Sequence, residues 1–252
     1  MTTESAPATA VEVLNATGVR LAETPAPELA AEHQSAMDRV WEKATAANPS
    51  LFDGPAVICT ALERHDGAVD LSWAATTYRR FALRRVPGAP VVSSVFVTVA
   101  QPVEDGRIVV GRMSVSTAAP GRWQLPGGNV EPPRSGETLD EAELRRQAAK
   151  ELAEEAWIDV AADALALLSI TRGENGNVGL HYLAPPLPER LVMARFADVA
   201  EAEAAQGRAA ELDEIVLLAS PKDLAELDGQ HVDYLEPLLE HYTERTAGRT
   251  DE

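Results

Sequence analysis

The stretch from Gly121 to Val160 constrains the fold more than any other part of the chain. A short apolar run, Trp123 to Leu125, predicts a strand, and Pro126-Gly127-Gly128 predicts the turn that ends it. A capping box, Thr138-Leu139-Asp140-Glu141, follows and predicts a helix that starts near Leu139 and runs to about Ala156. The chain must therefore fold so that a double glycine and a long helix come together.

Three acidic residues crowd the end of this predicted helix. Residues three and four apart share one helical face, so Glu151, Glu154 and Glu155 bring their carboxylates together. Like charges at that spacing repel, and Lys150 alone does not neutralise three of them. A hard divalent cation with oxygen ligands, Mg²⁺ or Mn²⁺, would compensate the negative charge of these carboxylates. Taken without its surroundings, the same pattern is also typical of a solvated acidic helix face.

Two segments of this stretch resemble the Nudix hydrolase family. The family signature is G-x5-E-x7-R-E-U-x-E-E-x-G-U, where U is aliphatic, and W-x-L-P-G usually precedes it. Trp123-Gln124-Leu125-Pro126-Gly127-Gly128 is similar to the lead-in, and the segment from Lys150 to Ile158 is similar to the end of the signature. The resemblance implies that Glu151, Glu154 and Glu155 bind Mg²⁺ (or Mn²⁺), with the Gly128 carbonyl as a further ligand.

The chain departs from the signature at four points. Eight residues separate Gly128 from Glu137 instead of five, and twelve separate Glu137 from Lys150 instead of seven. Lys150 replaces an arginine and keeps its charge but not its bidentate geometry. Which acid replaces the family's early glutamate as the partner of Lys150 (Glu137, Glu141 or Glu143) stays open. From helical spacing we expect Arg145, Arg146 and Lys150 to pair with Glu141, Glu143 or Glu154. Trp157 replaces a glycine, and because a tryptophan does not easily adopt the left-handed conformation, we expect the helix to end differently.

The resemblance implies a function as well as a fold. It implies Mg²⁺-dependent hydrolysis of the pyrophosphate in a nucleoside diphosphate linked to another group, with a sugar nucleotide or ADP-ribose as the first choice of substrate. Glu151, Glu154 or Glu174 would act as the base. Two alternatives stay open: a non-catalytic nucleotide or ligand sensor on a degenerate Nudix fold, and a hydrolase of nucleoside triphosphates or another organic diphosphate.

Composition limits the partners of the chain. The 252 residues include 45% apolar residues and carry a net charge of −18, which disfavours nucleic acid and anionic membranes as partners. Cys59 is the only cysteine, so no intramolecular disulfide forms. We expect Cys59 to be a buried core residue. The N-terminus does not have the pattern of a signal peptide, and we expect a cytoplasmic protein.

Periodicity and turn signals predict an α/β fold with an addition at its N-terminus. We expect a Nudix-type α/β/α sandwich with a mixed sheet in residues 89–246, a helix-and-hairpin extension in residues 1–88 and a frayed tail in residues 247–252. Residues 1–10 are expected to be loose. The extension is expected to shape the substrate pocket or to form a homodimer contact. The predicted strands are Val11–Leu14, Ala56–Arg64, Val69–Thr76, Val91–Ala100, Arg107–Met113, Ala164–Thr171, Val178–Ala184 and Ile215–Ala219, and the other predicted helices lie in Pro25–Ala47, Phe196–Gln206, Pro221–Leu227 and Val232–Tyr242.

The extension has a resemblance of its own. Asn48-Pro49-Ser50-Leu51-Phe52-Asp53-Gly54, followed by a pair of strands, is similar to the N-terminal extension of longer Nudix proteins that act on UDP-sugars. It covers few residues, and none of them carries chemistry.

Several residues outside the helix are candidates for binding substrate. Tyr78 and Arg84 belong to a basic and aromatic segment, Tyr78 to Arg85, which is either a nucleotide clamp or a connector whose aromatic rings point inward. Arg112 ends a predicted strand and either binds a phosphate oxygen or is an exposed strand-end residue. Gly127 and Gly128 let backbone atoms approach a diphosphate.

Three further residues or segments could supply chemistry. Glu174 and His181 are candidates for an extra general base, although we expect His181 to be a satisfied strand histidine. The acidic run Glu211-Leu212-Asp213-Glu214 lies where many Nudix enzymes place a fourth metal or base carboxylate, and surface charge is the alternative for it.

Overall fold

The computed structural model of the chain describes residues 11–207 and 209–247. The predictions of a loose segment at residues 1–10 and a frayed tail lie outside the described residues, except that Ala247 ends the last helix. No described helix has both the length and the apolar character that a bilayer crossing needs. The elements in chain order are β1 (Glu12–Leu14), β2 (Val19–Glu23), α1 (Ala31–Ala47), β3 (Pro55–His65), β4 (Ala68–Thr77), η1 (Tyr78–Arg85), β5 (Ser93–Ala100), β6 (Ile108–Met113), β7 (Trp123–Gln124), β8 (Gly127–Asn129), α2 (Glu141–Ala156), η2 (Ala162–Ala164), β9 (Ala166–Arg172), η3 (Glu174–Gly176), β10 (Val178–Leu183), α3 (Glu189–Ala205), β11 (Leu212–Leu218), η4 (Pro221–Glu226) and α4 (Leu235–Ala247).

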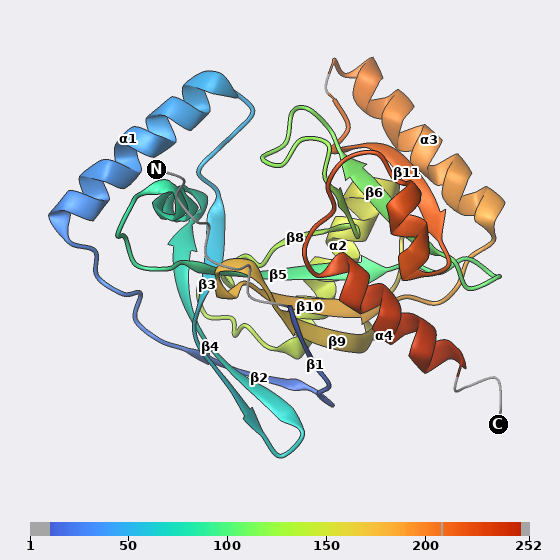
Figure 1. Ribbon diagram of the computed structural model, residues 1–252, viewed down its shortest axis with the longest axis horizontal. Helices are drawn as coiled ribbons and strands as arrows, with labels where there is room; N and C mark the ends of the chain where they lie inside the picture. Colours follow the sequence, from blue (N-terminus) through green and yellow to red (C-terminus); the bar gives the residue numbers. More distant parts are fainter. Residues whose placement is uncertain (1–10, 208, 248–252) are drawn as a thin grey trace.

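A larger mixed sheet and a smaller antiparallel sheet form the centre of the molecule (Figure 1). The larger sheet has the strand order β1-β9-β10-β5-β3-β4-β2, and β8 also pairs with β5. Its pairs are antiparallel except for β10 with β5 and β2 with β4, which run parallel. The smaller sheet has the order β11-β6-β7. Strand β5 therefore lies at the centre, where β3, β8 and β10 all reach it.

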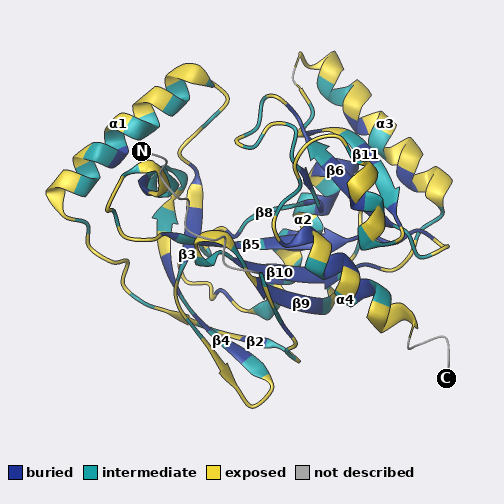
Figure 2. Ribbon diagram, viewed as in Figure 1, coloured by how far each residue is buried: buried dark blue, intermediate teal, exposed yellow. Residues whose placement is uncertain are grey.

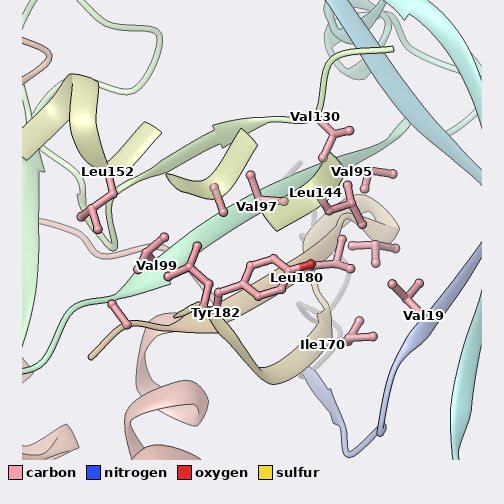
Figure 3. Close-up of a cluster of buried hydrophobic side chains, with 14 of the residues drawn as sticks. Val19, Val95, Val97, Val99, Val130, Leu144, Leu152, Ile170, Leu180 and Tyr182 are labelled. Carbon is pink, nitrogen blue, oxygen red and sulfur yellow. The ribbon is translucent and has the colours of Figure 1, made fainter. Parts of the chain in front are cut away.

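Helices α2 and α4 cover opposite faces of these strands. Successive side chains of a strand point to opposite faces. In β6, Val109 joins the apolar cluster that contains Leu144 and Leu152 of α2, whereas Ile108 and Val110 join the cluster that contains the buried face of α4. Figure 3 shows the α2 leucines directed at the valines of β5. The predicted α/β/α arrangement with a mixed sheet is confirmed.

The first 88 residues extend the larger sheet. The β3–β4 hairpin forms at the predicted Asp66-Gly67 turn and joins β5 through Ile58 and Cys59. Helix α1 packs on η1 over a small apolar cluster that includes Met37 and Leu83. Figure 2 shows that the central strands β5, β9 and β10 are buried, while the outer faces of α1 and α3 are exposed. Cys59 is half-buried and packs against the main core, so its expected full burial is wrong.

Both ends of α2 differ from the prediction. The N-cap is Asp140, whose side chain accepts a hydrogen bond from the Glu143 amide at 2.8 Å, so the predicted Thr138 capping box is wrong. At the other end Trp157 adopts the left-handed conformation, with φ 50° and ψ 28°, and its amide donates to the Ala153 carbonyl. The expectation that Trp157 avoids this conformation is also wrong. Trp157 is itself exposed, whereas its neighbours Ala156 and Ile158 are buried in the core.

Smaller differences concern element boundaries. Helix α1 begins at Ala31, after the predicted start near Pro27, and β2 is a strand that the sequence pattern did not predict. Strand β2 has only two apolar residues directed at the core, Val19 and Leu21, and exposed residues follow them, so its alternation is too short to indicate a strand.

The position of the N-cap gives a test of the α2 boundary. Asp140→Ala removes the side chain that satisfies an amide in the first turn, so the free energy of unfolding should fall by about 1 kcal/mol. Thr138→Ala, at the position that the sequence pattern favoured, should change it by less than about 0.5 kcal/mol. Urea denaturation of the two variants beside the wild type measures the difference. Equal losses in both variants would contradict the observed cap.

Candidate functional site

The pitch of α2 places its three acidic residues in different surroundings. The buried stripe of the helix contains Leu144, Ala148 and Leu152, and Glu155 continues it because it lies three residues after Leu152. Glu155 is consequently buried, with 2% of its surface exposed. Glu151 is half-buried, and Glu154 is exposed. The helix thus presents a gradient from a buried carboxyl to one in solvent.

The double glycine forms the surface against which these carboxyls pack. Gly127 and Gly128 belong to β8, which pairs antiparallel with β5, so the predicted turn is wrong and a short strand takes its place. The Gly127 amide donates a hydrogen bond to Glu155 Oε2 at 3.0 Å. A Cβ on Gly127, whose φ is +154°, would overlap the Val97 carbonyl oxygen, and a Cβ on Gly128 would lie 2.7 Å from the Glu151 carboxyl carbon. Only glycine lets the helix and the strand come this close.

Burial and mutual repulsion raise the pKa values of this cluster. Burial, together with the charges of Glu211 and Glu154, raises the pKa of Glu151 to about 7. Burial raises the pKa of Glu155 well above its ordinary value, and the charges of Glu211 and Glu151 add to the effect. Desolvation raises the pKa of Glu211, and the charge of Glu154 adds to the effect. Four carboxyl groups therefore act on one another at one end of α2.

Glu211 is the residue that the sequence left undecided. It lies just before β11, and its carbonyl oxygen accepts a hydrogen bond from the Ser114 amide at 2.8 Å. This bond holds the start of β11 beside the loop that leads to β7. No spacing along the chain indicates the approach, because the loop and β11 are almost a hundred residues apart. We propose below that Glu211 belongs to the site.

Several features of the cluster fit a divalent cation. Glu155 Oε1 is buried and has no hydrogen-bond partner among the described residues, so it is an acceptor without a donor. The neighbouring carboxyls supply oxygen ligands of the kind that Mg²⁺ prefers. Among the described residues, no three His, Cys, Asp or Glu side chains already stand at metal-binding distances from a common point. The donors suit the ion, and the side chains would close around it on binding.

Lys150 pairs with Glu154 rather than with Glu137, Glu141 or Glu143. Its Nζ lies 3.7 Å from a Glu154 carboxylate oxygen and 3.9 Å from one of Glu131, and it is exposed. Glu141 pairs with Arg145 and Glu143 with Arg146, so the expected pairing of the three basic residues of the helix with Glu141, Glu143 and Glu154 is confirmed.

Arg112 lies over Trp123 and is engaged by acidic neighbours. Its Nε donates to Asp213 Oδ1 at 2.8 Å, and its Nη2 is 3.0 Å from Glu214 Oε2. The guanidinium carbon stands 5.7 Å from the centre of the Trp123 ring. A phosphate would have to displace these carboxylates, so phosphate binding by Arg112 stays a prediction.

Tyr78 and Arg84 come from the extension, and both approach loops of the core. The Tyr78 ring makes edge contacts with Trp41 and Phe81, and burial raises the pKa of its hydroxyl, to which the charge of Glu211 contributes. The Arg84 guanidinium donates to Asn177 Oδ1 at 2.6 Å. Tyr78 is therefore packed among aromatic rings of the extension, and Arg84 is held at the η3 loop.

The extension touches the core at a further point. The Asn48 side-chain amide donates to the carbonyl oxygens of Ser116 and Thr117, at 3.1 and 3.3 Å. These two residues follow Ser114, the partner of the Glu211 carbonyl, so the extension, the β6–β7 loop and the acidic cluster are linked in one chain of contacts.

The other two base candidates lie in different settings. Glu174 is in η3, where its amide donates to Asp233 Oδ2 at 2.6 Å, and its charge acts on Arg84. Glu174 is not among the charges that shift the pKa of Glu151 or Glu155. His181 is buried between Thr98 and Thr171, whose hydroxyls lie 2.7 and 2.8 Å from its ring nitrogens, and burial lowers its pKa to about 3. The expectation of a satisfied strand histidine is confirmed.

Comparisons with known proteins identify the class to which this fold and this site belong. The family model of the NUDIX domain matches residues 92–242, which is more than half of the chain. The chain therefore belongs to the Nudix family, and the resemblance of its glycine and glutamate segments is confirmed. The family generally uses divalent metal ions such as Mg²⁺. No curated protein matches the chain.

Solved structures similar to this chain are distant. They include the MutT protein from Methanosarcina mazei Go1 (19% identity, 61% of this chain and 95% of that chain, TM-score 0.41) and NrtR from Shewanella oneidensis (16% identity, 62% and 65%, TM-score 0.42). A third is a bifunctional NMN adenylyltransferase/ADP ribose pyrophosphatase from Francisella tularensis (18% identity, 69% and 44%, TM-score 0.36). Scores this low carry no argument about function.

The raised pKa values predict how stability depends on pH without metal. Because the folded protein holds protons on these glutamates at a pH where the unfolded chain has lost them, stability should fall as pH rises from about 4.5 through 7. Glu155→Gln removes one of the charges, so its melting temperature in EDTA should fall less over this range. Calorimetric melting at steps between pH 4.5 and 8 measures the two profiles.

Added Mg²⁺ and a matched variant complete this test. Mg²⁺ at pH 8 should raise the melting temperature of the wild type more than that of Glu155→Gln, because the ion binds the folded cluster. Glu240→Gln, an exposed residue of α4, should behave as the wild type does. If Glu155→Gln and the wild type gave the same pH profile, the glutamate cluster would not be the source of the effect.

Proposed function

We propose that the protein is a Mg²⁺-dependent diphosphohydrolase that cleaves the pyrophosphate of a nucleoside diphosphate linked to another group. One observation carries the proposal: the buried Glu155 and the half-buried Glu151 pack on a double-glycine strand, and one Glu155 oxygen has no donor among the described residues. An arrangement this costly without metal is expected where a bound cation compensates it. Membership of the Nudix family supports the same function.

The glutamates of the site would bind the metal ion and help to position the substrate. Glu151, Glu154 and Glu155 would hold Mg²⁺ (or Mn²⁺), with the Gly128 carbonyl as a further ligand. When bound, the ion neutralises diphosphate charge and polarises the phosphorus that is attacked. Glu155 is fixed by its bond from Gly127, so its position is set before substrate arrives.

The proton of the attacking water passes to a carboxylate of the chain. Glu151, Glu154 and Glu174 are the candidates that the sequence supplied, and Glu211 joins them because its charge contributes to the raised pKa of Glu151 and the charge of Glu154 contributes to its own. The water oxygen forms a bond to one phosphorus, and the bond from that phosphorus to the bridging oxygen breaks. The bridging oxygen leaves with the other phosphate. Glu174 is the weakest candidate, since its charge does not act on the cluster.

The extension supports a nucleotide-linked substrate. We propose that residues 1–88 form one wall of the substrate site, because Asn48 ties the extension to the β6–β7 loop, and Ser114 of that loop donates to the Glu211 carbonyl oxygen. Tyr78, Arg84 and Arg112 would then bind the nucleotide. A sugar nucleotide or ADP-ribose is the first choice, and no nucleic acid is expected for a chain with a charge of −18. The lone Cys59 agrees with a cytoplasmic location.

A non-catalytic ligand sensor is the second candidate. It is favoured by the absence of a preassembled metal centre among the described residues and by the loose, exposed position of Lys150. A sensor would bind a nucleotide tightly without turning it over.

A substrate panel with and without Mg²⁺ separates these functions. Sugar nucleotides, ADP-ribose and nucleoside triphosphates are supplied in ¹⁸O-labelled water, and mass spectrometry locates the label in the products. At least one diphosphate ester should be split into two monophosphates, and only with Mg²⁺ or Mn²⁺. Glu151→Gln and Glu154→Gln should each lower kcat by about 100-fold or more, because they weaken ion and water positioning together. Glu240→Gln serves as the matched control.

The outcomes are distinct. Tight binding of a nucleotide without turnover would favour the sensor. Turnover that persists in both glutamine variants or in EDTA would rule out the proposed site.

A further inference from the structure

A groove of about 660 Å³ lies beside the acidic cluster, and its lining includes Glu151. One wall is the loop of residues 131–138, which is part of the lengthened connection between β8 and α2. The other wall is a polar stripe of α2 that ends at Glu151. The volume lies within the roughly 300–1,000 Å³ of small-molecule sites. Because Glu151 closes one end, whatever occupies the groove lies next to the reacting diphosphate.

The loop wall is anchored to the helix. The Glu131 amide donates to Gln147 Oε1 at 2.8 Å, and Gln147 Nε2 donates back to the Glu131 carbonyl oxygen at 3.1 Å. Further along, the Glu137 amide donates to the Arg134 carbonyl oxygen at 2.9 Å and closes a turn. Two prolines, Pro132 and Pro133, lie between these points and restrict the backbone. The groove is therefore built into the fold before any ligand arrives.

The side chains of the groove exclude several kinds of ligand. None of the described residues that line it is aromatic, so a nucleobase finds no ring on which to stack and a quaternary ammonium finds no aromatic cage. Five acidic and three basic side chains line it, and this formal excess of two negative charges repels a further phosphate or carboxylate. Apart from the prolines the lining is polar, which disfavours an apolar group.

The kind of ligand that still fits the groove is a neutral group with many hydroxyls. Arginine and lysine donate hydrogen bonds, carboxylates accept them, and a hydroxyl does both. The Arg134 side chain makes no hydrogen bond or ion pair with any described residue, and Lys150 is only loosely held, so both have donors to give. Glu137, across the turn from Arg134, supplies an acceptor.

We propose that this groove binds the sugar half of a nucleoside diphosphate sugar, with Arg134 and Glu137 determining specificity for a polyhydroxylated group. The proposal rests on the diphosphohydrolase function proposed above. It sets the orientation of the substrate: the diphosphate lies at the glutamate cluster, the sugar lies toward the 131–138 loop, and the nucleotide lies toward the extension. The lengthened loop then serves to build a pocket for the group beyond the diphosphate.

Matched esters of one nucleotide test which half of the substrate uses the groove. UDP-glucose, GDP-mannose and ADP-ribose are each compared with the methyl and the 2-aminoethyl ester of the same nucleoside diphosphate. Hydrolysis is measured as kcat/KM with Mg²⁺, and binding is measured by titration calorimetry in the Glu154→Gln background. At least one sugar ester should exceed both of its simple esters by about tenfold or more in both measurements.

Variants of the groove should reduce that advantage. Arg134→Ala and Glu137→Ala should each lower the ratio of sugar ester to methyl ester by about fivefold or more, mainly through KM. Arg195→Ala, an exposed arginine of α3 far along the chain, is the control and should keep the wild-type ratio.

The results separate failure of the groove from failure of the function. Equal use of sugar and methyl esters, a preference for the aminoethyl ester, or an unchanged ratio in both variants would overturn the sugar groove and leave the hydrolase standing. If no diphosphate ester is bound or hydrolysed by the wild type, the hydrolase and the groove both fail.

Discussion

The structure depends on keeping an acidic group inside the protein. Glu155 is buried at the end of α2, one of its oxygens accepts a hydrogen bond from the Gly127 amide, and the other has no partner among the described residues. An ionised carboxylate in such a place is costly unless a cation or further donors compensate it. Strand β8 has glycines at the two points of contact because any side chain there would overlap β5 or Glu151. The packing of α2 on β8 and the burial of the Glu155 carboxyl therefore depend on each other.

The rest of the fold holds this arrangement and surrounds it. The apolar stripe of α2 packs on the valines of β5 (Figure 3) and fixes the rotation of the helix, so Glu151 and Glu155 face β8 while Glu154 is exposed. The start of β11 brings Glu211 to the same place through the bond from Ser114. The extension joins the β6–β7 loop through Asn48, and the loop before α2 forms a polar groove that includes Glu151.

The helix, its buried face and the glutamates followed from the sequence because they are local and periodic. Leu152 and Glu155 lie on one stripe whatever the rest of the chain does. The predictions that were wrong concern features that depend on contacts distant in sequence or on competition between neighbouring residues. Asp140 and Thr138 are both good caps, and Asp140 is the one whose side chain accepts from the first turn of the helix. Trp157 takes a conformation that a tryptophan avoids in isolation, between the buried residues Ala156 and Ile158. The role of Glu211 was undecided because more than eighty residues separate it from the glycines.

Binding of Mn²⁺ tests the central claim most directly. The electron paramagnetic resonance signal of free Mn²⁺ disappears on binding, so a titration counts ions and gives their affinity without any substrate. The account predicts one ion bound per chain, displaced by Mg²⁺, and an affinity at least tenfold weaker in Glu155→Gln than in the wild type. If the wild type binds Mn²⁺ no better than Glu155→Gln does, the buried carboxyl cluster is not a metal site and the account is wrong.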